Sequence, residues 1–145
     1  MIGIPVDLSE AKGSIRKEMH KTLVVEDNSA FRESLIGMLE GRFSTLVFEK
    51  AASSEEALLK LSRFSPELVF LDIGLPGKNG LALSKILRDR FEKVVIVVLT
   101  NHDGPEYRQA ATRCGANFFI SKYGSTVDEI IEVVERVVGG PSIHH

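Results

Sequence analysis

The sequence predicts an α/β fold built on a doubly wound sheet of five parallel strands in the order 2-1-3-4-5. Short apolar runs bounded by turn residues alternate five times with segments of helical periodicity, and the connections between them are short. Such alternation is typical of parallel strands joined by right-handed crossovers. In this strand order the winding direction reverses between the first and third strands, and ligands of such sheets bind at that point.

The first two strand–helix units are predicted from apolar runs and helix caps. A buried strand at 22–25 precedes a helix whose apolar residues, from Phe31 onward, recur at helical spacing, and Gly41 is expected to end it. The second strand, at 45–51, contains charged residues and is therefore expected near an edge of the sheet. The helix that follows it opens with a Ser-x-x-Glu capping box at 53–56.

The third unit contains the stretch that organises the chain. Four apolar residues at 68–71 run directly into Asp72, and a turn rich in Pro, Gly and Asn follows. A short apolar run bounded in this way is typical of a strand that is buried on both faces, as in a parallel sheet. Asp72 is therefore expected at the carboxyl end of a central strand, ahead of a helix at 80–90.

The last two units complete the sheet. The most hydrophobic strand is expected at 94–99, and the helix after it begins near Pro105, because proline is tolerated in a first helical turn. Gly115 is expected to end that helix. A fifth strand at 117–120 and an amphipathic helix at 126–138 follow.

Length and composition limit the function classes. The chain has 145 residues, 43% of them hydrophobic, which favours one domain with its own core. The net charge of −2 gives no electrostatic reason to expect direct binding to nucleic acid. No apolar run reaches the roughly 18 residues that cross a bilayer, and the start lacks the order of a signal peptide. We expect a cytoplasmic protein.

The domain organisation is predicted in three parts. Residues 1–20 show no clear period and are expected to form an N-terminal extension. Residues 21–140 contain all of the strand–helix units and are expected to form the one folded domain. Residues 141–145 are expected to be a tail, such as a remnant of expression.

Five polar side chains are expected at the carboxyl ends of the strands: Glu26, Asp27, Asp72, Thr100 and Lys122. Three converging acids would repel one another and raise one another's pKa values. A hard divalent cation relieves that repulsion, and Mg²⁺ is suited because it takes oxygen ligands and needs only one or two protein carboxylates. The pattern therefore predicts a magnesium site.

The same five side chains indicate phosphoryl transfer onto Asp72. A carboxylate can be the nucleophile, and this reaction depends mainly on positioning and on charge neutralisation. Mg²⁺ and the Lys122 ammonium would supply the charge, and the Thr100 hydroxyl a hydrogen bond. Each residue alone has an ordinary explanation, such as Asp27 capping a helix. Their joint occurrence at four strand ends carries the prediction.

In this combination the chain resembles a receiver domain of bacterial two-component response regulators, which has a flavodoxin-like fold, over residues 21–140. The motifs are two acids after the first strand, an aspartate before a Leu-Pro-Gly-x-x-Gly turn, a threonine after the fourth strand and a lysine after the fifth. The resemblance implies that Asp72 accepts phosphate from a phosphohistidine on a sensor histidine kinase or phosphotransfer protein. It implies that Mg²⁺ is bound by Glu26, Asp27, Asp72 and the backbone carbonyl of Gly74.

The resemblance also implies a conformational switch. Lys122 would pair with the phosphoryl group, Thr100 would move to bond it, and Phe119 would turn inward. This is a population shift between inactive and active surfaces, with the last strand and helix as the output surface. A receiver catalyses only its own phosphorylation and dephosphorylation, so no metabolic activity is expected.

Three departures from the family pattern affect these expectations. The lysine is often followed by a cis proline, whereas Tyr123 follows here; a cis bond before a non-proline residue costs about 2.5–4 kcal/mol, so we predict a trans bond. Asn101 is larger than the usual residue and could slow access to Asp72. Phe119 lacks the hydroxyl of a tyrosine. With Gly74 and His102, Asn101 is a candidate for tuning the lifetime of the phosphate.

Several alternatives stay open. The 99–107 segment resembles receivers that precede LuxR-type helix-turn-helix domains and regulate transcription, so a DNA-binding output domain is either missing or never present. The chain is either monomeric or a homodimer. A receiver-like interaction module that works without phosphorylation is the main rival. A small Mg²⁺-dependent aspartyl-phosphate phosphatase is a weaker one, because such enzymes place a second Asp where Gly74 stands.

Overall fold

The computed structural model describes residues 18–75, 79–123 and 127–139. The strands are β1 (His20–Val25), β2 (Leu46–Ala51), β3 (Leu68–Leu71), β4 (Val95–Thr100) and β5 (Phe118–Ser121). The helices are α2 (Ser29–Arg42), α3 (Ser54–Leu61), α4 (Gly80–Arg90), α5 (Pro105–Arg113) and α6 (Val127–Val138). The strands form one parallel sheet in the order β2-β1-β3-β4-β5, which confirms the predicted fold and topology.

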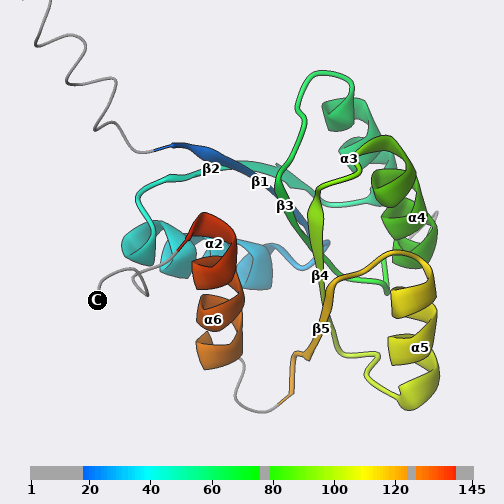
Figure 1. Ribbon diagram of the computed structural model, residues 1–145. Coiled ribbons are helices and arrows are strands. Elements are labelled where there is room, and N and C mark those ends of the chain that lie inside the picture. The colour runs from blue at the N-terminus through cyan, green and yellow to red at the C-terminus, as the bar shows by residue number, and fades with distance from the viewer. Residues whose placement is uncertain (1–17, 76–78, 124–126, 140–145) are drawn as a thin grey trace, which may run out of the picture.

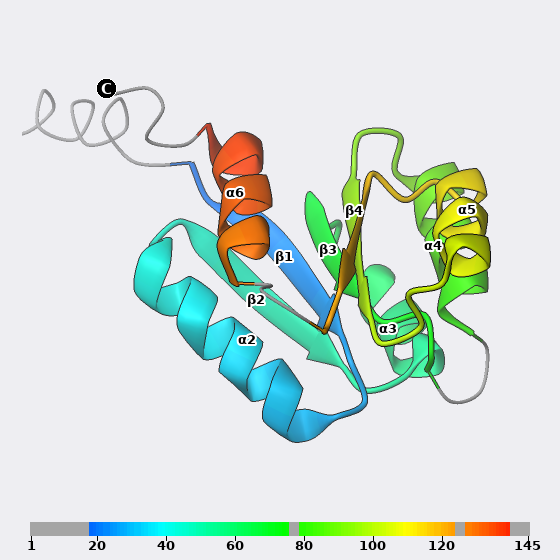
Figure 2. The same cartoon turned by 90° about the horizontal axis from the view of Figure 1, so that it is seen from below.

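Helices cover both faces of the sheet. Helices α2 and α6 lie on one face, and α3, α4 and α5 lie on the other (Figures 1 and 2). Each layer has its own core, because the side chains of a strand alternate between the two faces. Leu39 and Val134 pack under the first pair of helices, whereas Leu61 and Leu83 pack under the second group. Strand β3 is buried along its whole length, as predicted for a central strand.

Side-chain caps fix the starts of three helices. Asn28 Oδ1 accepts a hydrogen bond from the backbone N–H of Phe31 at the start of α2, and Asn79 caps α4 in the same way. The first bond of the predicted capping box is present in α3, where Ser53 Oγ accepts from the N–H of Glu56, whereas Glu56 Oε1 accepts from the N–H of Ala52. These bonds satisfy donors that the helix itself leaves unpaired. The predicted cap of the last helix lies outside the described residues.

Two predicted boundaries are wrong. Helix α2 continues through Gly41 to Arg42, and the N–H of Phe43 closes its last turn on Leu39. An exposed glycine is only modestly unfavourable within a helix, and here it does not break the pattern of buried leucines. His20 lies in β1, where its N–H donates to Thr45, so the first strand begins inside the segment expected to be an extension.

Within the described ranges no peptide bond is cis, so the bond between Lys122 and Tyr123 is trans as predicted. None of the helices in these ranges is both long and apolar enough to span a bilayer. The Pro-Gly turn after β3, residues 1–17 and the tail at 141–145 lie outside the described residues.

Candidate functional site

The ends of the central strands hold the site residues on fixed backbone. One residue beyond β1, the N–H of Glu26 donates to the carbonyl of Ala51, and one residue beyond β3, the N–H of Asp72 donates to Val25. The N–H of Lys122 likewise donates to the carbonyl of Thr100. The hydrogen bonds of the sheet thus continue one residue past each of these strands. The sheet therefore holds in place the backbone that carries Glu26, Asp72 and Lys122.

Three acids converge as the sequence predicts. Glu26, Asp27 and Asp72 each offer a carboxylate oxygen, and these atoms lie within 4.8 Å of one another. Glu26 is only 4% exposed and the Asp72 side chain 12% exposed, whereas Asp27 faces solvent. A cluster of carboxylates with one open side is a suitable donor set for a hard cation such as Mg²⁺.

Lys122 reaches into this cluster from β5. Its Nζ lies 2.7 Å from Glu26 Oε1 and 3.1 Å from Asp72 Oδ2, so one ammonium bridges two carboxylates. Burial raises the pKa of Glu26 above its ordinary value of 4.5, and the hydrogen bond from Lys122 offsets this only in part. Burial alone would lower the pKa of Lys122, but its hydrogen bonds to both carboxylates outweigh burial and raise that pKa. Lys122 is therefore charged at neutral pH.

The other oxygen of Asp72 is held by two donors. Thr100 Oγ1 donates to Asp72 Oδ1 at 2.8 Å, and the backbone N–H of Gly74 donates to the same atom at 2.9 Å. Thr100 is fully buried and its hydroxyl also accepts from the N–H of His102. Both carboxylate oxygens of Asp72 are thus oriented by hydrogen bonds. The structure therefore brings four of the five predicted side chains into direct contact, with Asp27 beside them.

His102 lies over Gly74 at the edge of the site. A Cβ atom added to Gly74 would lie 2.6 Å from Nε2 of His102 and 3.6 Å from Oδ1 of Asp72. The imidazole is tilted against the ring of Tyr107, with 5.3 Å between the ring centroids. Asn101, the third residue proposed to tune the phosphate lifetime, is exposed to solvent. A side chain at position 74 would therefore displace the ring of His102.

Gly80 supports the loop that carries Asp72. A Cβ atom added to this first residue of α4 would lie 2.5 Å from the Cα of Ile73 and 2.6 Å from the carbonyl oxygen of Asp72. Helix α4 therefore packs directly on the backbone after β3. Only glycine permits this approach, and it fixes the segment that follows the Asp72 carboxylate.

Two aromatic contacts are absent from the sequence prediction. The guanidinium of Arg108 lies 4.6 Å from the ring centroid of Phe119, the predicted switch residue, and its NH1 group reaches the Phe119 carbonyl. The Lys122 ammonium lies 4.3 Å from the ring centroid of Phe31. Phe31 is predicted above only as an apolar helix residue. No spacing rule relates a helix start to a strand end so far along the chain.

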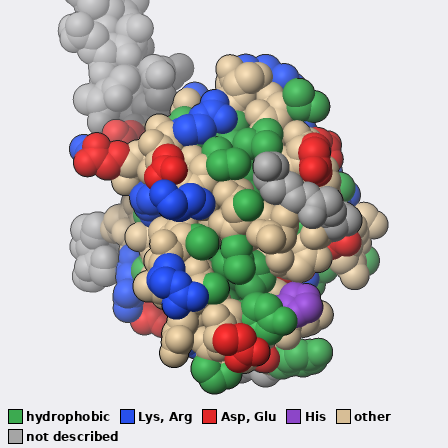
Figure 3. All heavy atoms as spheres, turned by 90° about the vertical axis from the view of Figure 1, so that its right-hand side faces the viewer, with side chains coloured by type: hydrophobic (Ala, Val, Ile, Leu, Met, Phe, Trp, Pro, Cys, Tyr) green, Lys and Arg blue, Asp and Glu red, His purple; other side chains and the backbone are tan. Residues whose placement is uncertain are grey.

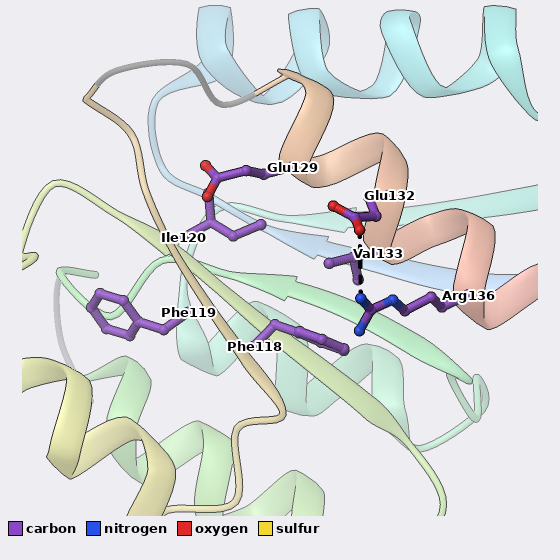
Figure 4. A pocket seen from close by; sticks show the side chains of 7 residues that line it. All are labelled: Phe118, Phe119, Ile120, Glu129, Glu132, Val133 and Arg136. Carbon is purple, nitrogen blue, oxygen red and sulfur yellow. Dashed lines mark hydrogen bonds and ion pairs between the residues drawn. The ribbon is translucent and has the colours of Figure 1, made fainter.

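A groove separates β5 from α6 on the same side of the sheet as α2. Its volume is about 210 Å³, and Figure 4 shows its lining side chains. Phe118 and Val133 lie across it, and Glu132 and Arg136 of α6 pair at its rim. Figure 3 shows the opposite side of the molecule, over α4 and α5, where basic, acidic and apolar side chains are interspersed.

A family model for the response regulator receiver domain matches residues 22–135. The chain belongs to the response regulator receiver family. This match begins at Thr22 within β1, takes in the rest of the sheet and ends at Glu135 within α6. The expected family, its fold and its place in two-component signalling are thereby confirmed.

Curated relatives of this receiver are longer proteins. A protein-glutamate methylesterase/protein-glutamine glutaminase of Geobacillus kaustophilus (strain HTA426) is 32% identical over 121 residues, which are 82% of this chain and 35% of that protein. The transcriptional regulatory protein DegU of Brevibacillus brevis is 28% identical over 123 residues, which are 84% of this chain and 52% of that protein. The chain therefore spans about half or less of each.

Solved structures agree with this assignment. A response regulator from Burkholderia pseudomallei, with a phosphorylated aspartic acid, a calcium ion and citrate, is 26% identical and superimposes with a TM-score of 0.72. The likeness covers 83% of this chain and 69% of that one. LuxR-family response regulators also superimpose, at 22% identity or less, and these support the fold alone.

Proposed function

We propose that this receiver accepts a phosphoryl group on Asp72 from a phosphohistidine of a sensor histidine kinase or phosphotransfer protein. The orientation of the Asp72 carboxylate supports this proposal. Thr100 and Gly74 donate to one of its oxygens, and Lys122 donates to the other. A nucleophile that is already aligned loses less freedom on reaction, which favours transfer.

The transfer needs no reactant besides the phosphohistidine and a proton from solvent. A carboxylate oxygen of Asp72 forms a bond to phosphorus while the bond between phosphorus and the donor imidazole nitrogen breaks. The electron pair of that bond stays on the imidazole, which takes up a proton. Lys122 remains charged and neutralises part of the negative charge on the acyl phosphate that results.

The acid cluster fits Mg²⁺ by its chemistry. Carboxylate oxygens of Glu26, Asp27 and Asp72 lie close enough to share one ion, and we propose that the backbone carbonyl of Gly74 joins them. A bound Mg²⁺ would neutralise charge on the phosphoryl group during transfer. The calcium ion and phosphorylated aspartic acid in the Burkholderia protein support this assignment.

Phosphorylation would change the surface at β5 and α6. Thr100 would turn from Asp72 towards the phosphoryl group, and Phe119 would move inward beneath it. The groove between β5 and α6 would then change shape, because Phe118, Phe119 and Ile120 line it. We propose this as the output surface of a cytoplasmic regulator, either through a homodimer or through a DNA-binding domain.

The receiver itself is proposed to act on no other substrate, although some relatives are methylesterases. We also propose that the segment from β1, which begins at His20, to residue 140 forms the functional unit, with the residues before His20 as an extension and 141–145 as a tail. Asn101, His102 and Gly74 would set the lifetime of the acyl phosphate.

Intact mass after incubation with acetyl phosphate tests the proposal. The native chain should gain one phosphoryl group only when Mg²⁺ is present, and Asp72→Asn should gain none. Asp89→Asn is a matched control, because that acid is exposed and pairs with Lys85 on the surface of α4, away from the acid cluster. An adduct on Asp72→Asn would overturn the proposal, as would sustained release of phosphate from p-nitrophenyl phosphate.

A further inference from the structure

Phe31 packs its ring against the ammonium of Lys122. The Nζ atom lies 4.3 Å from the ring centroid, within the range in which a cation is attracted by the face of an aromatic ring. The ring is partly buried in the first turn of α2 and contacts the core beneath that helix. Its backbone is fixed by the hydrogen bond from its N–H to Asn28 Oδ1 at 2.9 Å.

The ring and the carboxylates contact the same ammonium in different ways. Glu26 and Asp72 accept hydrogen bonds from Lys122, and both are also candidate ligands of Mg²⁺. A metal ion competes with Lys122 for their oxygen atoms. Phe31 has no ligand atom, so its attraction for the ammonium is not reduced when the carboxylates bind a cation.

We infer that Phe31 is a positioning residue that keeps the Lys122 ammonium beside Asp72 when the acid cluster is occupied by a cation. This inference rests on the proposed function. Helix α2 would then contribute to phosphoryl transfer through Phe31, in a way that the acids Glu26 and Asp27 before the helix do not. Phe31 should therefore influence the rate of transfer without contributing to the affinity for Mg²⁺.

The contact can be tested without metal or phosphate. The ε-methylene protons of Lys122 should show a ring-current shift by NMR in the native 145-residue chain. Phe31→Leu should abolish this shift, and Phe31→Tyr should keep it. Phe43→Leu is the matched control, because Phe43 packs against the same core at the other end of α2. A Lys122 signal that is unchanged in Phe31→Leu would overturn the inference.

The functional part is tested by comparing rate and affinity. At saturating Mg²⁺, Phe31→Leu should react with acetyl phosphate about 2–5-fold more slowly, the range expected for a partly exposed cation–π contact. Its Kd for Mg²⁺, followed by NMR, should be unchanged, because the ring of Phe31 supplies no ligand atom. Phe31→Tyr and Phe43→Leu should react at the native rate.

Two contrary outcomes are distinguishable. A parallel loss of rate, Mg²⁺ affinity and thermal stability in Phe31→Leu, without rescue by Phe31→Tyr, would show a purely structural role and overturn the inference. A native chain that forms no adduct, although its Lys122 signal is shifted by the ring, would instead overturn the proposed function.

Discussion

The ammonium of Lys122 lies 2.7 Å from Oε1 of Glu26, which is 96 residues earlier in the chain. Both side chains are nearly buried, with exposed fractions of 10% and 5%. Glu26 and Asp72 share this one ammonium, so its positive charge neutralises only part of their combined negative charge. The raised pKa of Glu26 follows, because the cost of burying its charge exceeds the stabilisation from a shared partner.

Glu26→Gln should stabilise the chain in the absence of Mg²⁺. The pKa of Glu26 is higher in the native than in the unfolded state, so between 4.5 and the raised value the native chain binds more protons. Stability should therefore fall as pH rises through that interval, and the loss remains at neutral pH. Gln resembles the protonated form and keeps an acceptor for Lys122. Thermal unfolding from pH 4 to pH 8 should show a smaller decline for the variant.

Added Mg²⁺ should reverse that order. The native chain gains stability by mass action, about 2.7 kcal/mol at a metal concentration of 100 Kd, whereas Glu26→Gln should gain less. Asp89→Asn should follow the native chain throughout. A Glu26→Gln variant that is less stable than the native chain without metal would contradict this account of the acid cluster.

Gly80→Ala should destabilise the chain by about 1–3 kcal/mol, because its Cβ atom would overlap the backbone of Ile73 and the carbonyl of Asp72. Gly37→Ala is the control: it lies within α2 with nothing within 4 Å, and should stabilise by roughly 0.5–1 kcal/mol. Urea unfolding measures both. Equal effects of the two substitutions would show that α4 does not pack on the backbone of Asp72 and Ile73 as described.

His102→Ala should speed loss of phosphate from Asp72 severalfold. The imidazole covers Gly74 beside the Asp72 carboxylate, so its removal should open a path for water. Gly74→Ala should act in the same direction, since its Cβ atom would displace the ring, and it should add nothing in the His102→Ala background. Decay of the adduct, followed by intact mass after removal of the phosphodonor, tests this. An unchanged decay rate in His102→Ala would show that His102 does not affect the lifetime of the phosphate.

The fold and the acid cluster could be predicted because both follow from local patterns. Apolar runs and capping signals identify the elements, and parallel topology brings the strand ends to one edge of the sheet. Glu26, Asp72, Thr100 and Lys122 meet for that reason, and their sequence positions at strand ends were sufficient to indicate it. Gly74 and His102, each two residues past a site residue, were also expected near the pocket.

Contacts made by side-chain direction could not be predicted. Phe31 fits an apolar helix face, and nothing in its spacing indicates that the ring also meets Lys122. Arg108 on Phe119 depends likewise on how α5 packs beside β5. The sequence predicts that α2 ends at Gly41, because glycine often follows the last turn of a helix. At this exposed position no side chain is needed for packing, so the glycine is accommodated within the helix.

Locating the phosphoryl group on the chain identifies the residue that accepts it. The full chain is treated with acetyl phosphate and Mg²⁺, any acyl phosphate is reduced with borohydride, and the digested peptides are sequenced by mass spectrometry. We expect reduction of the Asp72 side chain to that of homoserine, which should be absent without Mg²⁺ and in Asp72→Asn. Reduction at Asp27 or Glu26, or none at position 72 in a chain that binds Mg²⁺, would contradict the account.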